Sequence, residues 1–175
     1  MPELINPKSR VPELDLPLLG GGQFDIHEAE PENFTLIVVY RGLHCPKCKD
    51  QLQAIDPMVE DLKSRGYDIV AVSMDGEARA RKARKDWEIE NIPIAYDMGL
   101  LTAKSWGLFI SDKREGSDEP NLFSEPGLFV VKPDGSLYAE YIQNTPFGRP
   151  PLDEVANGLD FVVKHDYPTR GTSVA

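Results

Sequence analysis

The chain has 175 residues, 41% of them hydrophobic, and a formal net charge of −10, which suits one domain with a buried core. It has no apolar run of about 18 residues, and its start, "MPELINPKSR", lacks a signal-peptide core, so we expect neither a membrane span nor secretion by that route. The negative charge and the absence of a basic cluster argue against nucleic-acid and membrane partners.

The first third of the chain predicts a hairpin, a strand and a helix. Three consecutive glycines interrupt the alternating segment "PELDLPLLGGGQFDI" at 12–26, which indicates an N-terminal β-hairpin. The apolar, β-branched run "FTLIVVY" at 34–40 is typical of a central strand buried on both faces. Apolar residues at helical spacing predict a helix over 46–65, with a kink caused by Pro57.

The rest of the chain continues the alternation of strands and helices. We expect strands at 67–75 and 92–97, helices at 76–90 and 99–107, a surface loop at 110–125, a hairpin at 127–143, a helix at 151–165 and a loose tail after it. This order predicts an α/β fold with a mixed central β-sheet flanked by helices.

Both cysteines of the chain, Cys45 and Cys48, lie in "VVYRGLHCPKCKDQL" at 38–52. A metal clip, a structural disulfide and a redox pair are the three alternatives. A structural zinc needs four ligands, and the remaining histidines form no matching pair. A disulfide across so small a loop constrains little of the chain. Because no signal sequence precedes it, we expect the protein in the reducing cytoplasm, where such a pair is more often redox-active.

The expected position of the pair explains how it would react. Cys45 follows a central strand and opens a helix, with Pro46 in the first turn, where its missing N–H costs nothing. The helix N-terminus favours negative charge and therefore a thiolate at Cys45. Cys48 lies one turn further on the same face, close enough to form a disulfide. Lys47 adds positive charge, and His44 is a candidate for proton exchange.

The motif "HCPKCK" between a strand and a helix resembles the active site of thioredoxin-fold proteins, including the C-P-x-C of glutaredoxins. The wider chain is similar to the alkyl hydroperoxide reductase/thiol-specific antioxidant family of peroxiredoxin-like redoxins. The resemblance extends over about 11–165 and rests on four segments: "VPELDLPLLGGGQFDI", "YDIVAVSMD", "IPIAYDMGLLTAKSWGL" and "GLFVVKPDGSLYAEY".

The resemblance implies a single thioredoxin-like (redoxin) domain spanning 1–175. It implies an antioxidant oxidoreductase in which Cys45 attacks a peroxide or a disulfide and Cys48 resolves the product. An external thiol reductant of the thioredoxin or glutathione type would reset the pair, without a metal or organic cofactor. It leaves room for a homodimer. The alternatives are a thiol–disulfide oxidoreductase without peroxidase activity and a non-catalytic redox-sensing or binding module.

The sequence departs from the family pattern at three positions. In P-x-x-x-[TS]-x-x-C, the proline and hydroxyl positions are Val38 and Gly42 here. The arginine expected before "G-L-F" is replaced by Pro126, which resembles the cis-proline of thioredoxins and predicts a cis bond after residue 125. Arg41 and Arg149 are the candidates to replace the missing positive charge.

Overall fold

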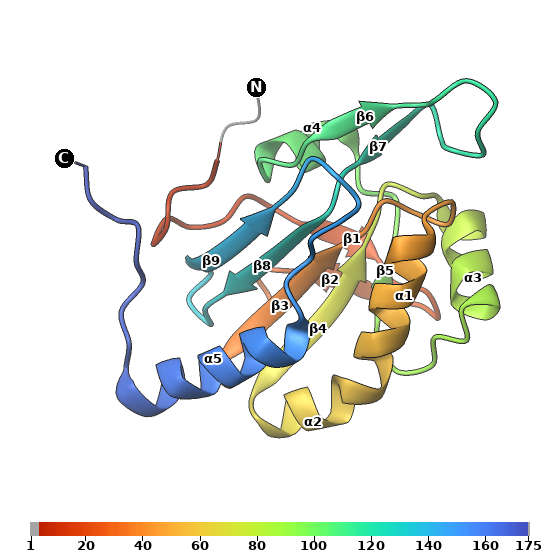
Figure 1. Ribbon diagram of the computed structural model, residues 1–175. Coiled ribbons are helices and arrows are strands. Elements are labelled where there is room, and N and C mark those ends of the chain that lie inside the picture. The colour runs from red at the N-terminus through yellow and green to blue at the C-terminus, as the bar shows by residue number, and fades with distance from the viewer. Residues whose placement is uncertain (1–3, 175) are drawn as a thin grey trace.

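The computed structural model describes residues 4–174, and its centre is a five-stranded mixed sheet in the order β5-β4-β3-β8-β9 (Figure 1). The strands are β3 (Phe34–Val39), β4 (Tyr67–Val72), β5 (Ile94–Ala95), β8 (Gly127–Val131) and β9 (Leu137–Ile142). β3 pairs parallel to β4 and antiparallel to β8. All six residues of β3 are buried, as a continuous apolar run predicts. The expected mixed sheet and its central strand are confirmed.

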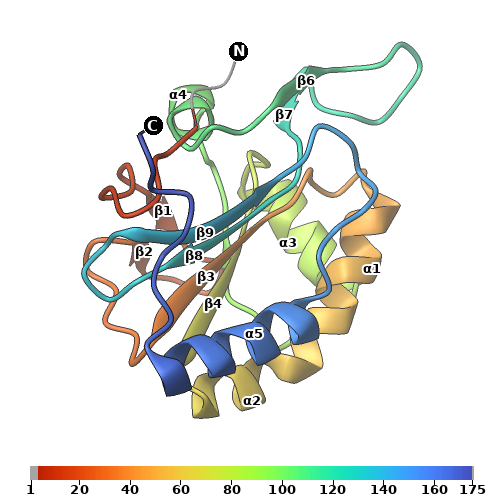
Figure 2. The same ribbon diagram turned by 60° about the vertical axis from the view of Figure 1, so that its left-hand side comes forward.

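Helices and a hairpin cover the two faces of this sheet (Figure 2). One core cluster contains side chains from α1 (Pro46–Ile55), α2 (Val59–Ser64), α3 (Glu77–Asp86) and α5 (Leu152–His165). The other cluster contains side chains from α4 (Leu100–Ser105) and from the hairpin of β1 (Asp15–Pro17) and β2 (Gln23–Asp25). The predicted N-terminal hairpin and flanking helices are therefore confirmed. Residues 167–174 form no helix or strand, and residue 175 lies outside the described part of the chain.

Pro57 interrupts the helix that follows β3. α1 ends at Ile55, a 3₁₀ turn covers Asp56–Met58, and α2 begins at Val59. Proline has no N–H to continue the helical hydrogen bonds, and its ring clashes with the preceding turn. The predicted distortion at Pro57 is therefore an interruption between two helices.

The carboxylate of Asp56 joins this interruption to the segment just before β5. Its Oδ1 accepts the N–H groups of Asn91 and Ile92, both at 2.8 Å, and its Oδ2 accepts the N–H of Glu90 at 3.1 Å. Burial alone would raise the pKa of Asp56, but these hydrogen bonds to the charged form outweigh burial and lower it. Residues 90–92 are thereby held against the helical layer.

The segment 110–125, expected to be a loop, contains a short antiparallel hairpin instead. β6 (Ile110–Asp112) pairs with β7 (Leu122–Ser124), and the two form a separate two-stranded sheet. The loop prediction was wrong because each strand has only three residues, too few to show a period of two among polar side chains.

The predicted cis bond before Pro126 is also wrong, because the described residues contain no cis peptide bond. The chain runs extended from β7 into β8 here. The N–H of Glu125 donates to the carbonyl of Phe109 at 2.8 Å, and the carbonyl of Pro126 accepts the N–H of Gln143 at 3.1 Å. A trans bond keeps this path straight, and the residue before a proline favours the extended conformation.

Candidate active site

Cys45 and Cys48 form a disulfide at the start of α1, with Cα atoms 5.2 Å apart. Cys45 is the N-cap residue, with φ −102° and ψ 105°, and its Sγ accepts the N–H of Cys48 at 3.1 Å. Pro46 occupies the first helical turn, as the sequence predicts. The two cysteines are only 1% and 0% exposed. The pair therefore lies at the positive end of a helix dipole and is almost completely covered.

A buried carboxylate fixes the loop that leads into the pair. Asp75, which is 3% exposed, accepts the N–H of Leu43 through Oδ2 at 2.7 Å. Its Oδ1 accepts the Nε–H of Arg79 at 2.9 Å. Gly42 has φ +132°, and a Cβ there would lie 2.8 Å from Asp75 Oδ2. The close approach of this carboxylate explains why glycine stands where the family pattern has a hydroxyl residue.

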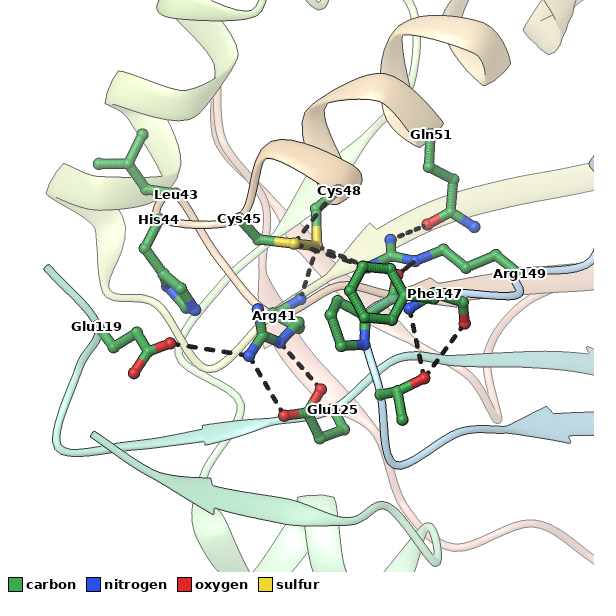
Figure 3. Close-up of a disulfide and its surroundings, with 12 residues drawn as sticks. Arg41, Leu43, His44, Cys45, Cys48, Gln51, Glu119, Glu125, Phe147 and Arg149 are labelled. Atoms are coloured by element: carbon green, nitrogen blue, oxygen red, sulfur yellow. Dashed lines mark hydrogen bonds and ion pairs between the residues drawn. A yellow bond between two sulfur atoms is a disulfide. The ribbon is translucent and has the colours of Figure 1, made fainter. Parts of the chain in front are cut away.

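Arg149 lies against both sulfur atoms (Figure 3). Its Nη2 is 3.1 Å from Cys48 Sγ and 3.6 Å from Cys45 Sγ, and its Nη1 donates to Gln51 Oε1 at 2.5 Å. Burial, and then the nearby positive charge of Arg41, lower the pKa of Arg149 to about 10. The guanidinium thus remains charged at neutral pH and lies where it can stabilise a thiolate on either sulfur.

Arg41, the other candidate arginine, directs its side chain away from the sulfurs. Its Nε donates to Glu125 Oε2 at 2.9 Å, its Nη2 is 3.8 Å from Glu119 Oε1, and its guanidinium lies 4.8 Å from the ring centre of Phe123. Its backbone N–H, however, donates to Cys48 Sγ at 3.3 Å. Of the two arginines, Arg149 brings charge to the disulfide, and Arg41 brings a main-chain hydrogen bond.

His44 lies beside the pair, between α1 and the β6–β7 hairpin (Figure 3). Its ring packs edge-on against Phe123 with centroids 4.7 Å apart, and its Nδ1 is 3.5 Å from Arg79 Nη2. Burial lowers the pKa of His44, and the charge of Arg41 lowers it further. Its Nε2 is buried and makes no hydrogen bond within residues 4–174. The ring is therefore biased to the neutral form near the sulfurs but is not hydrogen-bonded to them.

The two remaining candidates lie at the margin of the site. Lys47 is exposed on the first turn of α1, and Pro126 is buried directly after Glu125, the carboxylate that holds Arg41. Pro126 therefore borders the site through its neighbour.

Sequence reasoning missed four residues that organise this site. They are Gln51, Asp75, Glu119 and Glu125. Only Asp75 had a usable signal, because it follows β4, and the carboxyl ends of the parallel strands β3 and β4 meet at the same edge of the sheet. Arg41 and Glu125 are 84 residues apart, a separation at which spacing carries no information.

Residues 4–174 contain neither a metal-binding cluster nor a membrane-spanning helix. No group of three or more His, Cys, Asp or Glu side chains there could hold a metal ion. None of the helices in that range is long and apolar enough to cross a membrane.

A CxxC disulfide at a helix start beside a mixed sheet is the arrangement of a thioredoxin-like fold. The AhpC/TSA family model matches residues 7–140, so the chain belongs to the AhpC/TSA family, as its motifs suggested. A search of curated proteins found no sequence match.

Solved structures with the same fold include peroxiredoxins and a peroxiredoxin-like protein. A peroxiredoxin-like protein from Aquifex aeolicus is 16% identical, with TM-score 0.73 and coverage of 91% of this chain and 89% of that one. AhpC from Mycobacterium tuberculosis is 17% identical, with TM-score 0.73 and coverage of 92% and 99%. Reduced Prx3 from Vibrio vulnificus, solved in complex with H2O2, is 18% identical, with TM-score 0.73 and coverage of 89% and 99%. At these identities the likeness establishes the fold.

Proposed function

We propose that this protein is a thiol-dependent reductase of small oxidants, peroxides above all, that works through Cys45 and Cys48. The observation that carries the proposal is the Cys45–Cys48 disulfide itself, which receives hydrogen bonds from two backbone N–H groups and from Arg149. In the reduced protein the same donors would stabilise a thiolate, which is the nucleophilic form of cysteine. Membership of the AhpC/TSA family supports peroxide as the oxidant.

The reaction balances with the two cysteines and one external reductant. The Cys45 thiolate attacks a peroxide oxygen, the S–O bond forms as the O–O bond breaks, and the leaving alkoxide takes up a proton to become an alcohol or water. The Cys48 thiolate then attacks the sulfenic sulfur and expels hydroxide, which is protonated to water, and this forms the disulfide. Two external thiols, from a thioredoxin-like protein or a glutathione-type pool, reduce the disulfide and become a disulfide themselves.

The burial of the pair favours a small oxidant over a protein disulfide. Cys45 is 1% exposed, and a bulky disulfide must reach sulfur in line with its own S–S bond. A peroxide needs much less space at the sulfur than a protein disulfide does. We place this chemistry in the cytoplasm and assign no cofactor to it.

Stopped-flow oxidation of the reduced protein tests this function. We expect hydrogen peroxide to oxidise it much faster than a peptide disulfide does. Cys48→Ser should stop at a sulfenic acid on Cys45 that dimedone traps, whereas Cys45→Ser should not react. Oxidation by peroxide no faster than that of a free cysteine, or trapping on Cys48 in place of Cys45, would contradict the proposal.

A specific observation also favours a second candidate, thiol–disulfide exchange without peroxidase activity. Gly42 stands three residues before Cys45, where a hydroxyl would orient a peroxide, and the C-P-x-C pair resembles that of glutaredoxins. The same stopped-flow comparison distinguishes the two, because this candidate predicts that the peptide disulfide is the faster oxidant.

A further inference from the structure

A cavity of about 710 Å³ lies along the edge of the main sheet, next to the β1–β2 hairpin and α2. Thr35, at the start of β3, lines it, whereas the disulfide follows the other end of that strand. In Figure 1 this edge is the part of β4 that extends beyond the short β5. The cavity is therefore separate from the redox site. Its volume is within the usual range of ligand sites, about 300–1,000 Å³.

The edge of β4 facing the cavity has unpaired backbone groups. β5 pairs only with Ala71 and Val72, and the Ala71 N–H donates to the Pro93 carbonyl at 2.9 Å. Backbone groups alternate along a strand, so the N–H and C=O of Ile69 face the same side. Pro93 has no N–H to offer, and residues 90–92 are held by Asp56. Within residues 4–174, the Ile69 backbone therefore finds no partner on that side.

The cavity also offers a side-chain hydrogen-bonding group. Thr35 lines it, and the Thr35 hydroxyl makes no hydrogen bond to the other residues of 4–174. This oxygen is not among the buried polar atoms that lack a partner, so water satisfies it when the cavity is empty. A polar group on an occupant of the cavity would take the place of that water.

The side chains around the cavity indicate the chemistry of the occupant. Apolar walls come from Leu18, Phe24 and Val59, among others. The rim carries exposed carboxylates against a single lysine, Lys63; the carboxylates are Asp15, Glu28, Glu60 and Asp68. A ligand that combines apolar groups with positive charge complements this surface.

We propose that the cavity binds an extended peptide segment carrying lysine or arginine side chains, which adds to the edge of β4 as a short strand. The peptide main chain would exchange hydrogen bonds with the N–H and C=O of Ile69 and supply a partner for the Thr35 hydroxyl. Apolar side chains would enter the cavity and basic ones would meet the rim, which is the usual division of roles in strand addition. This binding is independent of the redox function proposed above.

Fluorescence polarisation with labelled acetyl-Val-Arg-Val-Arg-Val-amide tests the proposal on the full chain. We expect saturable binding, and none for the same peptide with glutamate in place of arginine. The double variant Glu60→Lys/Asp68→Lys should weaken binding about tenfold, because attraction becomes repulsion at two rim positions. The matched control Glu115→Lys/Asp118→Lys alters two exposed carboxylates of the loop between β6 and β7 and should leave binding unchanged.

Two further measurements separate strand addition from attraction between charges. Thr35→Val keeps the shape of the side chain and removes the hydroxyl, so we expect weaker peptide binding with unchanged peroxide reactivity. In amide NMR spectra the peptide should shift the Ile69 resonance. Displacement of the peptide by equimolar spermine, equal binding of the glutamate peptide, or an unshifted Ile69 resonance would overturn the proposal. If Thr35→Val fails to fold, the Ile69 resonance and the comparison of Glu60→Lys/Asp68→Lys with its control still test the proposal.

Discussion

Arg149 can contact both sulfurs because the guanidinium is a planar fork with several donors. One nitrogen, Nη2, reaches Cys48 and Cys45, while Nη1 donates to Gln51 and Nε donates to the Pro146 carbonyl at 3.0 Å. The outer contacts fix the plane of the group and hold its charge beside the two sulfurs of the disulfide. A lysine has a point charge on a flexible stem and could not make all of these bonds together.

Replacing Arg149 should slow the reaction of the reduced cysteines with alkylating agents. We expect Arg149→Gln to lower the rate of iodoacetamide alkylation at neutral pH by about tenfold or more, because a positive charge beside a thiolate favours ionisation by roughly one to three pH units. The alkylation rate of Arg149→Lys should lie between those of the wild type and Arg149→Gln. Thiolate absorbance measured against pH should move to higher pH in the same order.

The matched control for this substitution is Lys47→Gln, which removes an exposed charge from the first turn of α1. Solvent screens such a charge, so the thiolate titration should barely move. A titration that is equally displaced by both variants would show that general positive charge, not the contact made by Arg149, sets the reactivity.

At the scale of elements, the β6–β7 hairpin is tied to the site by carboxylates. Glu125 accepts hydrogen bonds from Arg41 and from the Ser111 hydroxyl, the latter at 2.7 Å. Glu119 accepts the Arg114 N–H at 2.8 Å and lies 3.8 Å from Arg41. The hairpin therefore holds the Arg41 side chain, whose own backbone N–H binds Cys48.

The hairpin should loosen in acid. The N–H of Arg114 is the main cause that lowers the pKa of Glu119 from 4.5 to about 2, against the opposing effect of burial. Because the folded pKa lies below the unfolded one, this stabilisation is fully present above pH 4.5 and is lost as the pH falls toward about 2. Hydrogen exchange of the β6 and β7 amides, corrected for the intrinsic effect of pH, should show protection falling over that interval.

Glu119→Gln supplies the comparison for the hairpin. The amide retains an oxygen acceptor but cannot titrate, so the variant should have weaker protection at neutral pH and a flatter dependence below pH 4.5. Equal acid sensitivity in the variant would assign the loosening to another group.

The contrast between this hairpin and β3 shows what could be predicted from the sequence. The six buried residues of β3 form an unbroken apolar run, and Cys45-Pro46 carries the features of a helix start, so local pattern sufficed for both. Next to the paired strands β6 and β7, Glu125 bonds to Arg41 and to the Phe109 carbonyl, contacts that no local pattern encodes. Likewise Arg149 and Cys48 are 101 residues apart, and only the folded chain selects Arg149 over Arg41.

Over the whole molecule, Asp56 connects the helical layer to the segment before β5, two parts that the sequence predicts independently of each other. Pro57 predicts the interruption after α1, but nothing local indicates that the preceding carboxylate will accept the N–H groups of residues 90–92, just before β5. This one side chain thereby ties the turn after α1 to the segment that leads into β5. Its effect on stability should be correspondingly large.

Asp56→Ala should therefore destabilise the fold by about 3 kcal/mol, because it leaves several backbone N–H groups without their acceptor. For a chain of this length that corresponds to a fall of roughly 6–12 °C in Tm. Urea unfolding of the oxidised protein at neutral pH would measure the loss directly. Asp56→Asn keeps one acceptor oxygen and should lose less stability, and Asp118→Ala, at an exposed loop position, should lose almost none.

The pKa of Asp56 is lowered from 3.8, so the stability that its carboxylate contributes is present above that pH and declines below it. Wild-type protein and Asp56→Ala should then converge in stability as the solution is acidified, and a constant difference down to strong acid would show that the carboxylate charge is not what holds residues 90–92.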